Sequence, residues 1–217
     1  MDGRLDSFSY LCEVFKTILP MKKIWKMACM ACLVAMAFSG MRCVNEPVVS
    51  SKVPLGKVVD SLNWVFLYHN PPAGSIDLDT LSEEQKMMVR VYTSGEYARR
   101  YYGLVFGIPL PQGLNSGTDF FNPSIADGQV NPATGLTQFA MPSATKPQEN
   151  DILVFGDSRD NPGGNVAIVA KVGNTELEIV QQNPGPLSNT RESYRYYIRK
   201  NKWYVQQPHV LGWLRKP

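Results

Sequence analysis

The last third of the chain alternates short apolar runs with turn residues, a pattern typical of β-strands. Gly173 and Asn174 separate two β-branched runs and therefore predict a hairpin. The expected strands lie at 151–155, 165–172 and 177–183, with one or two more at 203–207 and 210–215. Strands joined by such short connections predict an antiparallel sheet.

Two capping boxes ahead of these strands predict two helices. In each box the side chain of the capping residue accepts a hydrogen bond from the backbone N–H three residues later, and the side chain of that later residue accepts from the backbone N–H of the capping residue. The pairs are Ser82 with Gln85 and Thr93 with Glu96. The first helix is expected from residue 82 onward, and the second over 94–102, ending near Gly103.

The segments around these helices carry weaker signals. Residues 57–68 are apolar and are compatible with either a helix or a strand. Residues 109–150 are rich in Pro, Gly, Asn and Ser, and predict a long irregular connection of the kind that often carries function. Helices followed by an antiparallel sheet indicate an α+β domain.

The amino-terminal region reads as a leader. Residues 21–43 begin with basic residues, continue with an apolar stretch and contain small residues suited to cleavage, as in a secretory signal peptide. Residues 1–20 are interpreted as an over-extended start, which leaves Met1 and Met21 as alternative first residues. Cys43 is an alternative lipidation site. Residues 44–56 are expected to form a tether, and 57–217 the folded domain.

Cysteine, histidine and charge exclude several classes of protein. The four cysteines are at positions 12, 29, 32 and 43, so the domain has no disulfide framework and no cysteine-based metal site. With only His69 and His209, we expect no metal and no cofactor. The net charge of +3 comes from the residues before Val44, since six of the 22 basic and three of the 19 acidic residues lie there. The balanced domain gives no reason to expect nucleic acid, so the basic, aromatic run 191–204 is interpreted as a solvated sheet face.

Four segments in order resemble the CHAP family, papain-like amidases and endopeptidases that cleave peptidoglycan peptides. The segments are TSGEYARRYYGLVFGIPLP, ENDILVFGDSRDNPGGNVAIVAKV, LEIVQQN and VLGWLRKP. The closest form is the amidase domain of bifunctional glutathionylspermidine synthetases. The resemblance spans about residues 85–217. It implies the papain-like fold of the CHAP and NlpC families, with amino-terminal helices packed on an antiparallel sheet.

The same resemblance places three reactive positions on this chain. The family's nucleophilic cysteine corresponds to Ser94, its histidine base to Asn165 and its orienting residue to Gln181. A serine hydroxyl needs a base to become a nucleophile, and an amide accepts no proton at neutral pH. The three replacements together indicate a domain that has lost catalysis.

Each of these residues also has a simpler interpretation. Ser94 is a first-turn helix residue beside Thr93, and Asn165 follows two glycines as a turn residue would. Alternation along the strand that ends at 183 puts Gln181 and Asn183 on one face. If that face lines the groove, together with Ser94 and Asn165, these amides would hydrogen-bond a peptide backbone. His209 is an alternative base, although a loop position before the last strand accounts for it equally well.

Three functions remain open at this level. The first is a non-catalytic protein that binds a peptidoglycan peptide or a related ligand in the bacterial envelope. The second is a regulatory protein that binds an active amidase or another envelope protein. The third is an amidase or peptidase with altered chemistry at Ser94. In each case we expect an exported, periplasmic or envelope-associated protein that meets the membrane only through its signal or a lipid anchor.

Overall fold

The computed structural model describes residues 53–71, 77–159, 161–183 and 189–217, which belong to one compact unit, 52–217. The signal peptide, the extended start, Cys43 and most of the tether lie outside the described residues. Within the described ranges, no helix has the length and apolar character needed to cross a membrane.

The ambiguous segment 57–68 forms a β-hairpin. Strands β1 (Val58–Leu62) and β2 (Val65–Tyr68) pair antiparallel. Asn63 and Trp64 form the turn with φ values of 50° and 66°, the positive values of a type I′ turn. Because Val65 and Leu67 are buried while Phe66 is exposed, the segment has the two-residue period of a strand.

The two predicted helices are present. A one-turn 3-10 helix, η1 (Leu78–Thr80), precedes α3 (Glu83–Val91), which begins with the complete capping box of Ser82 and Gln85. Helix α4 (Ser94–Phe106) begins at Thr93, whose side chain accepts a hydrogen bond from the Glu96 N–H at 3.1 Å. The second box is only half formed, because the Glu96 carboxylate accepts from Arg100 Nε at 2.6 Å instead.

Helix α4 is longer than its sequence predicts. It continues through Gly103 to Phe106 and ends at Gly107, which has a φ of 67°. The Phe106 ring packs edge-on against Tyr101 and Tyr102, with centroids 6.0 and 5.3 Å away. This aromatic packing favours the additional turn, and Gly107 supplies the left-handed conformation that ends it.

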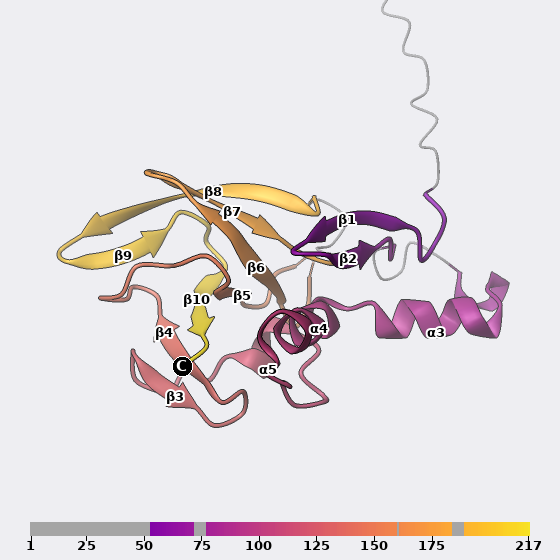
Figure 1. The fold of residues 1–217 in the computed structure, drawn as a ribbon, viewed down its shortest axis with the longest axis horizontal. Helices are drawn as coiled ribbons and strands as arrows, with labels where there is room; N and C mark the ends of the chain where they lie inside the picture. Colours follow the sequence, from indigo (N-terminus) through magenta and orange to yellow (C-terminus); the bar gives the residue numbers. More distant parts are fainter. Residues whose placement is uncertain (1–52, 72–76, 160, 184–188) are drawn as a thin grey trace, which may run out of the picture. The chain divides into compact units, whose positions relative to one another are not determined.

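Apart from the β1–β2 hairpin, the strands form one eight-stranded antiparallel sheet in the order β3-β4-β10-β5-β6-β7-β8-β9 (Figure 1). Their bounds are β3 Gln129–Asn131, β4 Leu136–Ala140, β5 Ile152–Phe155, β6 Asn165–Val172, β7 Glu176–Val180, β8 Arg191–Arg199, β9 Lys202–Val205 and β10 Val210–Arg215. The strands predicted at 151–155, 165–172 and 210–215 and the hairpin between β6 and β7 are confirmed, whereas the strands predicted over 177–183 and 203–207 end earlier, at Val180 and Val205. The prediction of an irregular 109–150 is wrong in part, since this segment contains β3, β4 and the short helix α5 (Gly117–Phe120). Strand β4 pairs with its neighbour β3 on one side and, on the other, with β10, which is distant in sequence.

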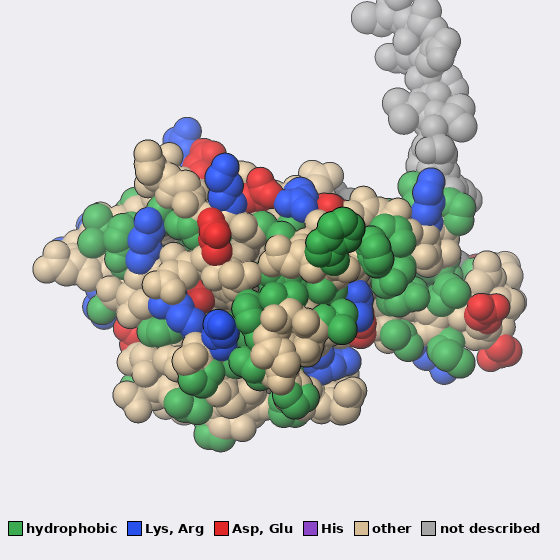
Figure 2. All heavy atoms as spheres, in the orientation of Figure 1, with side chains coloured by type: hydrophobic (Ala, Val, Ile, Leu, Met, Phe, Trp, Pro, Cys, Tyr) green, Lys and Arg blue, Asp and Glu red, His purple; other side chains and the backbone are tan. Residues whose placement is uncertain are grey.

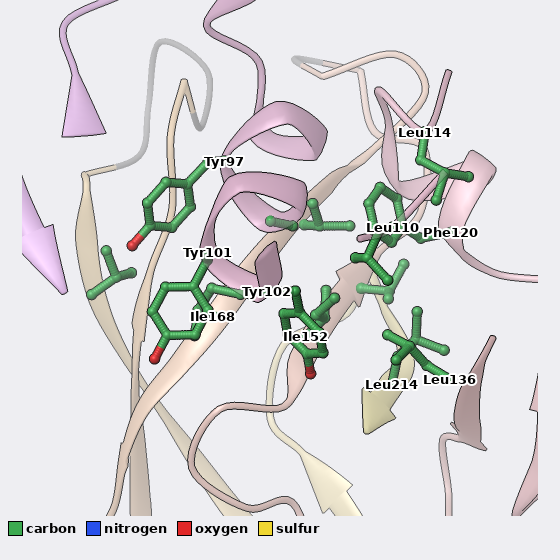
Figure 3. Packing of buried hydrophobic residues seen from close by; sticks show 14 of the residues in the cluster. Tyr97, Tyr101, Tyr102, Leu110, Leu114, Phe120, Leu136, Ile152, Ile168 and Leu214 are labelled. Carbon is green, nitrogen blue, oxygen red and sulfur yellow. The ribbon is translucent and has the colours of Figure 1, made fainter. Parts of the chain in front are cut away.

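The two faces of the sheet pack against two hydrophobic clusters. On one face, the tyrosines of α4 lie over Ile152 and Ile168, with Leu110, Leu114 and Phe120 beside them (Figure 3). On the other face, the second cluster takes buried residues from each of the strands β4, β5, β6, β7, β8, β9 and β10. The sheet must curve to bring these residues together, and register shifts within β6–β7 and β5–β10 accommodate that curvature.

The fold is therefore α+β, with a large antiparallel sheet and few helices. Helix α4 contacts β6 and β2, and α5 contacts β5 and β6. The expectation that the amino-terminal helices pack together on the sheet is wrong for α3, none of whose residues is buried. Figure 1 shows α3 set apart from the large sheet.

A polar network joins the hairpin, α4 and the start of β5. Asn63 Nδ2 donates to the Tyr101 hydroxyl at 2.6 Å, and that hydroxyl donates to Asn150 Oδ1 at 2.6 Å. The Tyr102 hydroxyl donates to the Asn150 backbone oxygen at 2.8 Å. Asn150 has a φ of 72°, a conformation that asparagine and glycine tolerate best. This network satisfies two of the polar groups that the tyrosine-rich face of α4 brings into the core.

Two glycines of α4 provide a matched test of this packing. A Cβ atom on Gly95 would lie against the Leu114 carbonyl oxygen and 2.7 Å from Asn115 Cα, whereas one on Gly103 would meet no atom within 4 Å. Gly95→Ala should lower the free energy of unfolding by about 1–3 kcal/mol through overpacking. Gly103→Ala should raise it by about 0.5–1 kcal/mol, because alanine is the better helix former. Urea denaturation measures both, and equal effects would contradict the contact between α4 and 114–115.

Candidate functional site

Ser94 is the first residue of α4 and is only 6% exposed. Its Oγ accepts a long hydrogen bond, 3.4 Å, from the Val166 N–H at the start of β6. The next residue, Gly95, lies directly under Leu114 and Asn115, and its N–H donates to the Asn115 oxygen at 3.3 Å. Part of the 109–150 connection is therefore packed onto the amino terminus of α4, beside the hydroxyl.

Asn165 and Gln181 are hydrogen-bonded to each other. Asn165 Nδ2 donates to Gln181 Oε1 at 2.7 Å, and Gln181 Nε2 donates to the Asn189 oxygen at 2.9 Å. Their exposed fractions are 5% and 3%. A catalytic base and its orienting partner would be joined in the same way, but an amide at the base position cannot accept and return a proton at neutral pH.

Gln182 is a buried polar residue to which the sequence analysis assigned no role. Its Oε1 accepts from the Tyr68 N–H at 3.2 Å, and its Nε2 approaches Glu96 Oε2 at 3.4 Å. The side chain is 1% exposed, so it ties β2 to the first turn of α4. Strand alternation gives no signal for this residue, because β7 ends at Val180, two residues earlier.

Asn183 does not continue the strand. Strand β7 ends at Val180, and Asn183 has a φ of 49°. The alternation that was expected to put Gln181 and Asn183 on one face therefore does not apply beyond Val180, because a left-handed residue breaks the two-residue period.

A small pocket of about 70 Å³ opens beside the Asn165–Gln181 pair. Its lining residues share an uncharged, polar or aromatic character: Phe155, Gly156, Ser158, Asn161, Gly164, Asn165, Gln181, Tyr194, Gln207 and His209. The rings of Phe155 and Tyr194 meet edge to face, with centroids 6.0 Å apart. The pocket thus combines amide donors and acceptors with an aromatic wall and has no Asp, Glu, Lys or Arg in its lining.

The pocket brings together some of the candidate residues and leaves others outside. Asn165, Gln181 and His209 line it, whereas Ser94 and Asn183 are not among the lining residues. In the described part of the chain no hydrogen bond joins Ser94 to His209, and the Gln207 side chain accepts from the His209 backbone N–H at 2.6 Å. Over the same described ranges, no cluster of three or more His, Cys, Asp or Glu side chains is arranged to hold a metal ion.

A buried ion pair fixes the strand that leads to the pocket. Asp151, 1% exposed, accepts from Arg215 Nη2 at 2.7 Å and from the Gln148 N–H at 2.7 Å. Burial raises the pKa of the Asp151 carboxyl, while the hydrogen bonds from Arg215 and Gln148 act in the opposite direction. The pair holds the first residue before β5 against the last residue of β10.

Comparison with known proteins identifies no family. No family model matches the chain, and no curated protein matches it. Among solved structures, it is similar to the one titled "The crystal structure of Ly7917", with 17% identity and a TM-score of 0.33. That match covers 58% of this chain and 59% of the other, so this chain spans about three fifths of that protein's length.

The unequal hydrogen bonds of Asn165 and Ser94 predict unequal costs of truncation. Asn165→Ala removes the donor to the buried Gln181 Oε1 and should lower the free energy of unfolding by about 1–3 kcal/mol. Ser94→Ala removes only the 3.4 Å bond to Val166 and should cost less than about 1 kcal/mol. Thermal and urea unfolding compare the two variants. A Ser94→Ala cost as large as that of Asn165→Ala would show that the hydroxyl is held more tightly than this geometry implies.

Proposed function

We propose that this protein is a non-catalytic CHAP-like domain that binds a cell-wall peptide in the bacterial envelope. The observation that carries the proposal is the neutral pocket beside the hydrogen-bonded Asn165–Gln181 pair. The proposal has four parts, namely a papain-like scaffold, the absence of catalysis, a peptide ligand and export to the envelope.

The arrangement of the elements supports the papain-like part. Ser94 stands at the amino terminus of a helix that packs on an antiparallel sheet, and its hydroxyl accepts from the N–H of Val166, the second residue of β6. Asn165 and Gln181, assigned as base and orienting residue by resemblance, are in contact. Asn150, where the family typically has glycine, has the positive φ that glycine adopts readily.

The chemistry of the three positions supports a non-catalytic role. The Ser94 hydroxyl accepts from a backbone N–H and has no hydrogen bond to an imidazole or carboxylate in the described residues. Without such a base a serine hydroxyl stays protonated and is a poor nucleophile. His209 reaches the pocket of Asn165 and Gln181, but Ser94 does not line that pocket. An altered hydrolase at Ser94 therefore has less support than binding.

The lining of the pocket supports an uncharged ligand with both donors and acceptors. Amides such as Asn161, Gln181 and Gln207 each offer N–H groups and a carbonyl, which matches the alternating groups of a peptide backbone. A volume of about 70 Å³ holds only a few water-sized groups. A peptide would therefore place one small side chain or terminal group inside and leave the rest on the surface.

Export to the envelope is the part of the proposal that rests on the leader alone. The basic start and apolar stretch of 21–43 are the signals for it. Amino-terminal sequencing of the secreted or membrane-extracted protein tests it, and retention of residues 1–43 in the mature chain would refute it.

Binding is tested at the pocket rim with two neighbouring glutamines. Muramyl peptide fragments should shift the amide NMR signals of residues around Asn165 and Gln181. Gln207→Ala should weaken binding about 2- to 10-fold through the loss of one or two hydrogen bonds. Gln206→Ala is the matched control, because Gln206 is exposed and lies outside the pocket lining, and its affinity should equal that of the wild type. The absence of any shift with the wild-type protein would refute the proposal.

Catalysis is tested with the same fragments over long incubation. The fragments should remain uncleaved by the wild-type protein, because no base in the described part of the chain is hydrogen-bonded to the Ser94 hydroxyl. Mass spectrometry of the mixture measures this, with Ser94→Ala as the background control. Cleavage by the wild type that disappears in Ser94→Ala would establish the altered hydrolase instead.

A further inference from the structure

The β8–β9 hairpin concentrates positive charge that the pocket does not use. Residues 195–204 read RYYIRKNKWY, with four basic residues and no acidic one. Arg199, Lys200 and Lys202 are exposed and have no salt bridge among the described residues, whereas Arg195 lies 3.5 Å from Glu176. Because the domain as a whole is charge-balanced, this end of the hairpin is a local cationic site.

The placement of these charges is unfavourable for the hairpin itself. Arg199 and Lys202 are direct cross-strand partners, and like charges in that position destabilise a sheet. Lys200 and Asn201 form the turn with φ values of 51° and 57°, where asparagine and glycine are preferred over lysine. Residues that are locally unfavourable for the fold are expected at positions where a function requires them.

Exposed apolar side chains lie on both faces of the same tip. Tyr197 and Ile198 are 45% and 54% exposed, and as neighbours in a strand they point to opposite faces. Tyr197 stacks on Tyr204 with ring centroids 5.2 Å apart, and Ile198 is opposite Trp203. Figure 2 shows hydrophobic side chains among the Lys and Arg side chains over this part of the molecule.

The base of the hairpin is anchored, so the tip is presented on a fixed support. Tyr196 and Val205 are buried in the second hydrophobic cluster. The Tyr196 hydroxyl donates to the Gly173 oxygen at 2.6 Å, and the Lys146 ammonium lies 5.0 Å from the Tyr196 ring centroid. The backbone that carries the charged and apolar side chains of the tip therefore starts from a fixed support.

We propose that the β8–β9 tip inserts into the interface of an anionic lipid bilayer. Lys and Arg side chains complement anionic headgroups, while Tyr and Trp rings prefer the level of those headgroups. A bilayer surrounds an inserted tip and so contacts both faces, whereas a polymer or nucleic acid would lie on one face. This contact is independent of the pocket and adds to any attachment through the leader or Cys43.

Vesicle co-sedimentation of the full chain tests the proposal, with vesicles of phosphatidylcholine alone and of phosphatidylcholine with 30% phosphatidylglycerol. The triple variant Arg199→Gln, Lys200→Asn and Lys202→Gln should bind the anionic vesicles about 100-fold more weakly, since each cation contributes about fivefold. Lys200→Asn alone suits the turn and should reduce binding about fivefold without loss of thermal stability. Ile198→Ser keeps every charge and should still weaken binding several-fold.

The leader is present in every variant, so only the differences between variants count. The charge-matched control Lys57→Gln, Arg90→Gln and Lys171→Gln removes three exposed cations elsewhere on the domain. Its preference for anionic over neutral vesicles, expressed as a difference in binding free energy, should remain more than half that of the wild-type protein. Equal loss in this control would show a net-charge effect and overturn the proposal. An unchanged Ile198→Ser, or equal binding of all variants, would also overturn it. Preferential binding of a single-stranded oligonucleotide would overturn it as well. Self-association of the triple variant with unchanged vesicle binding would also overturn it, and would show instead that Lys202 prevents other chains from pairing with the edge strand β9.

Discussion

Strands β5 and β6 are buried on both faces, and the remainder of the domain is arranged to keep them so. Their side chains alternate between the cluster under α4 and the cluster inside the curve of the sheet. Burying a strand on both sides requires a layer on each side. Helix α4 provides one layer, and the outer strands provide the other by curving round. The Asp151–Arg215 pair and the Asn150 network fix the point where the chain enters this pair of strands.

Elements that depend on contacts within a few residues could be predicted from the sequence, whereas those that depend on packing between distant segments could not. The strands of the last third and both capped helix starts followed from local patterns, because the relevant contacts lie within a few residues. The length of α4 did not, since Gly103 is a common helix end and only the packing of Phe106 on the tyrosines carries the helix further. Strand β4 was missed because its hairpin with β3 is very short and lies among turn-forming residues, while its longer pairing, with β10, is distant in sequence. The sequence of 58–68 is compatible with either a helix or a strand, and only the burial of Val65 and Leu67 with Phe66 exposed distinguishes the two.

The candidate site divides in a comparable way. The resemblance placed Asn165 and Gln181 together, and the structure joins them with a 2.7 Å hydrogen bond. Pocket-lining residues such as Ser158, Asn161 and Gln207 come from loops whose positions depend on the curvature of the sheet, which no local pattern encodes. Asn183 was assigned by extending a strand beyond its end. Gln182 went unassigned because a polar side chain buried under a helix looks, in sequence, like any other glutamine at a strand end.

The close contact between Gly95 and residues 114–115 limits what positions 94 and 95 can accept. Backbone atoms fill the space that a side chain at position 95 would need, so only glycine fits there without movement of the chain. Ser94, the residue before it, is only 6% exposed. A different side chain at position 94 would therefore stay largely enclosed, and opening this end of α4 to a molecule in solution requires the backbone of 114–115 to move, which no exchange of side chains at 94 or 165 achieves by itself.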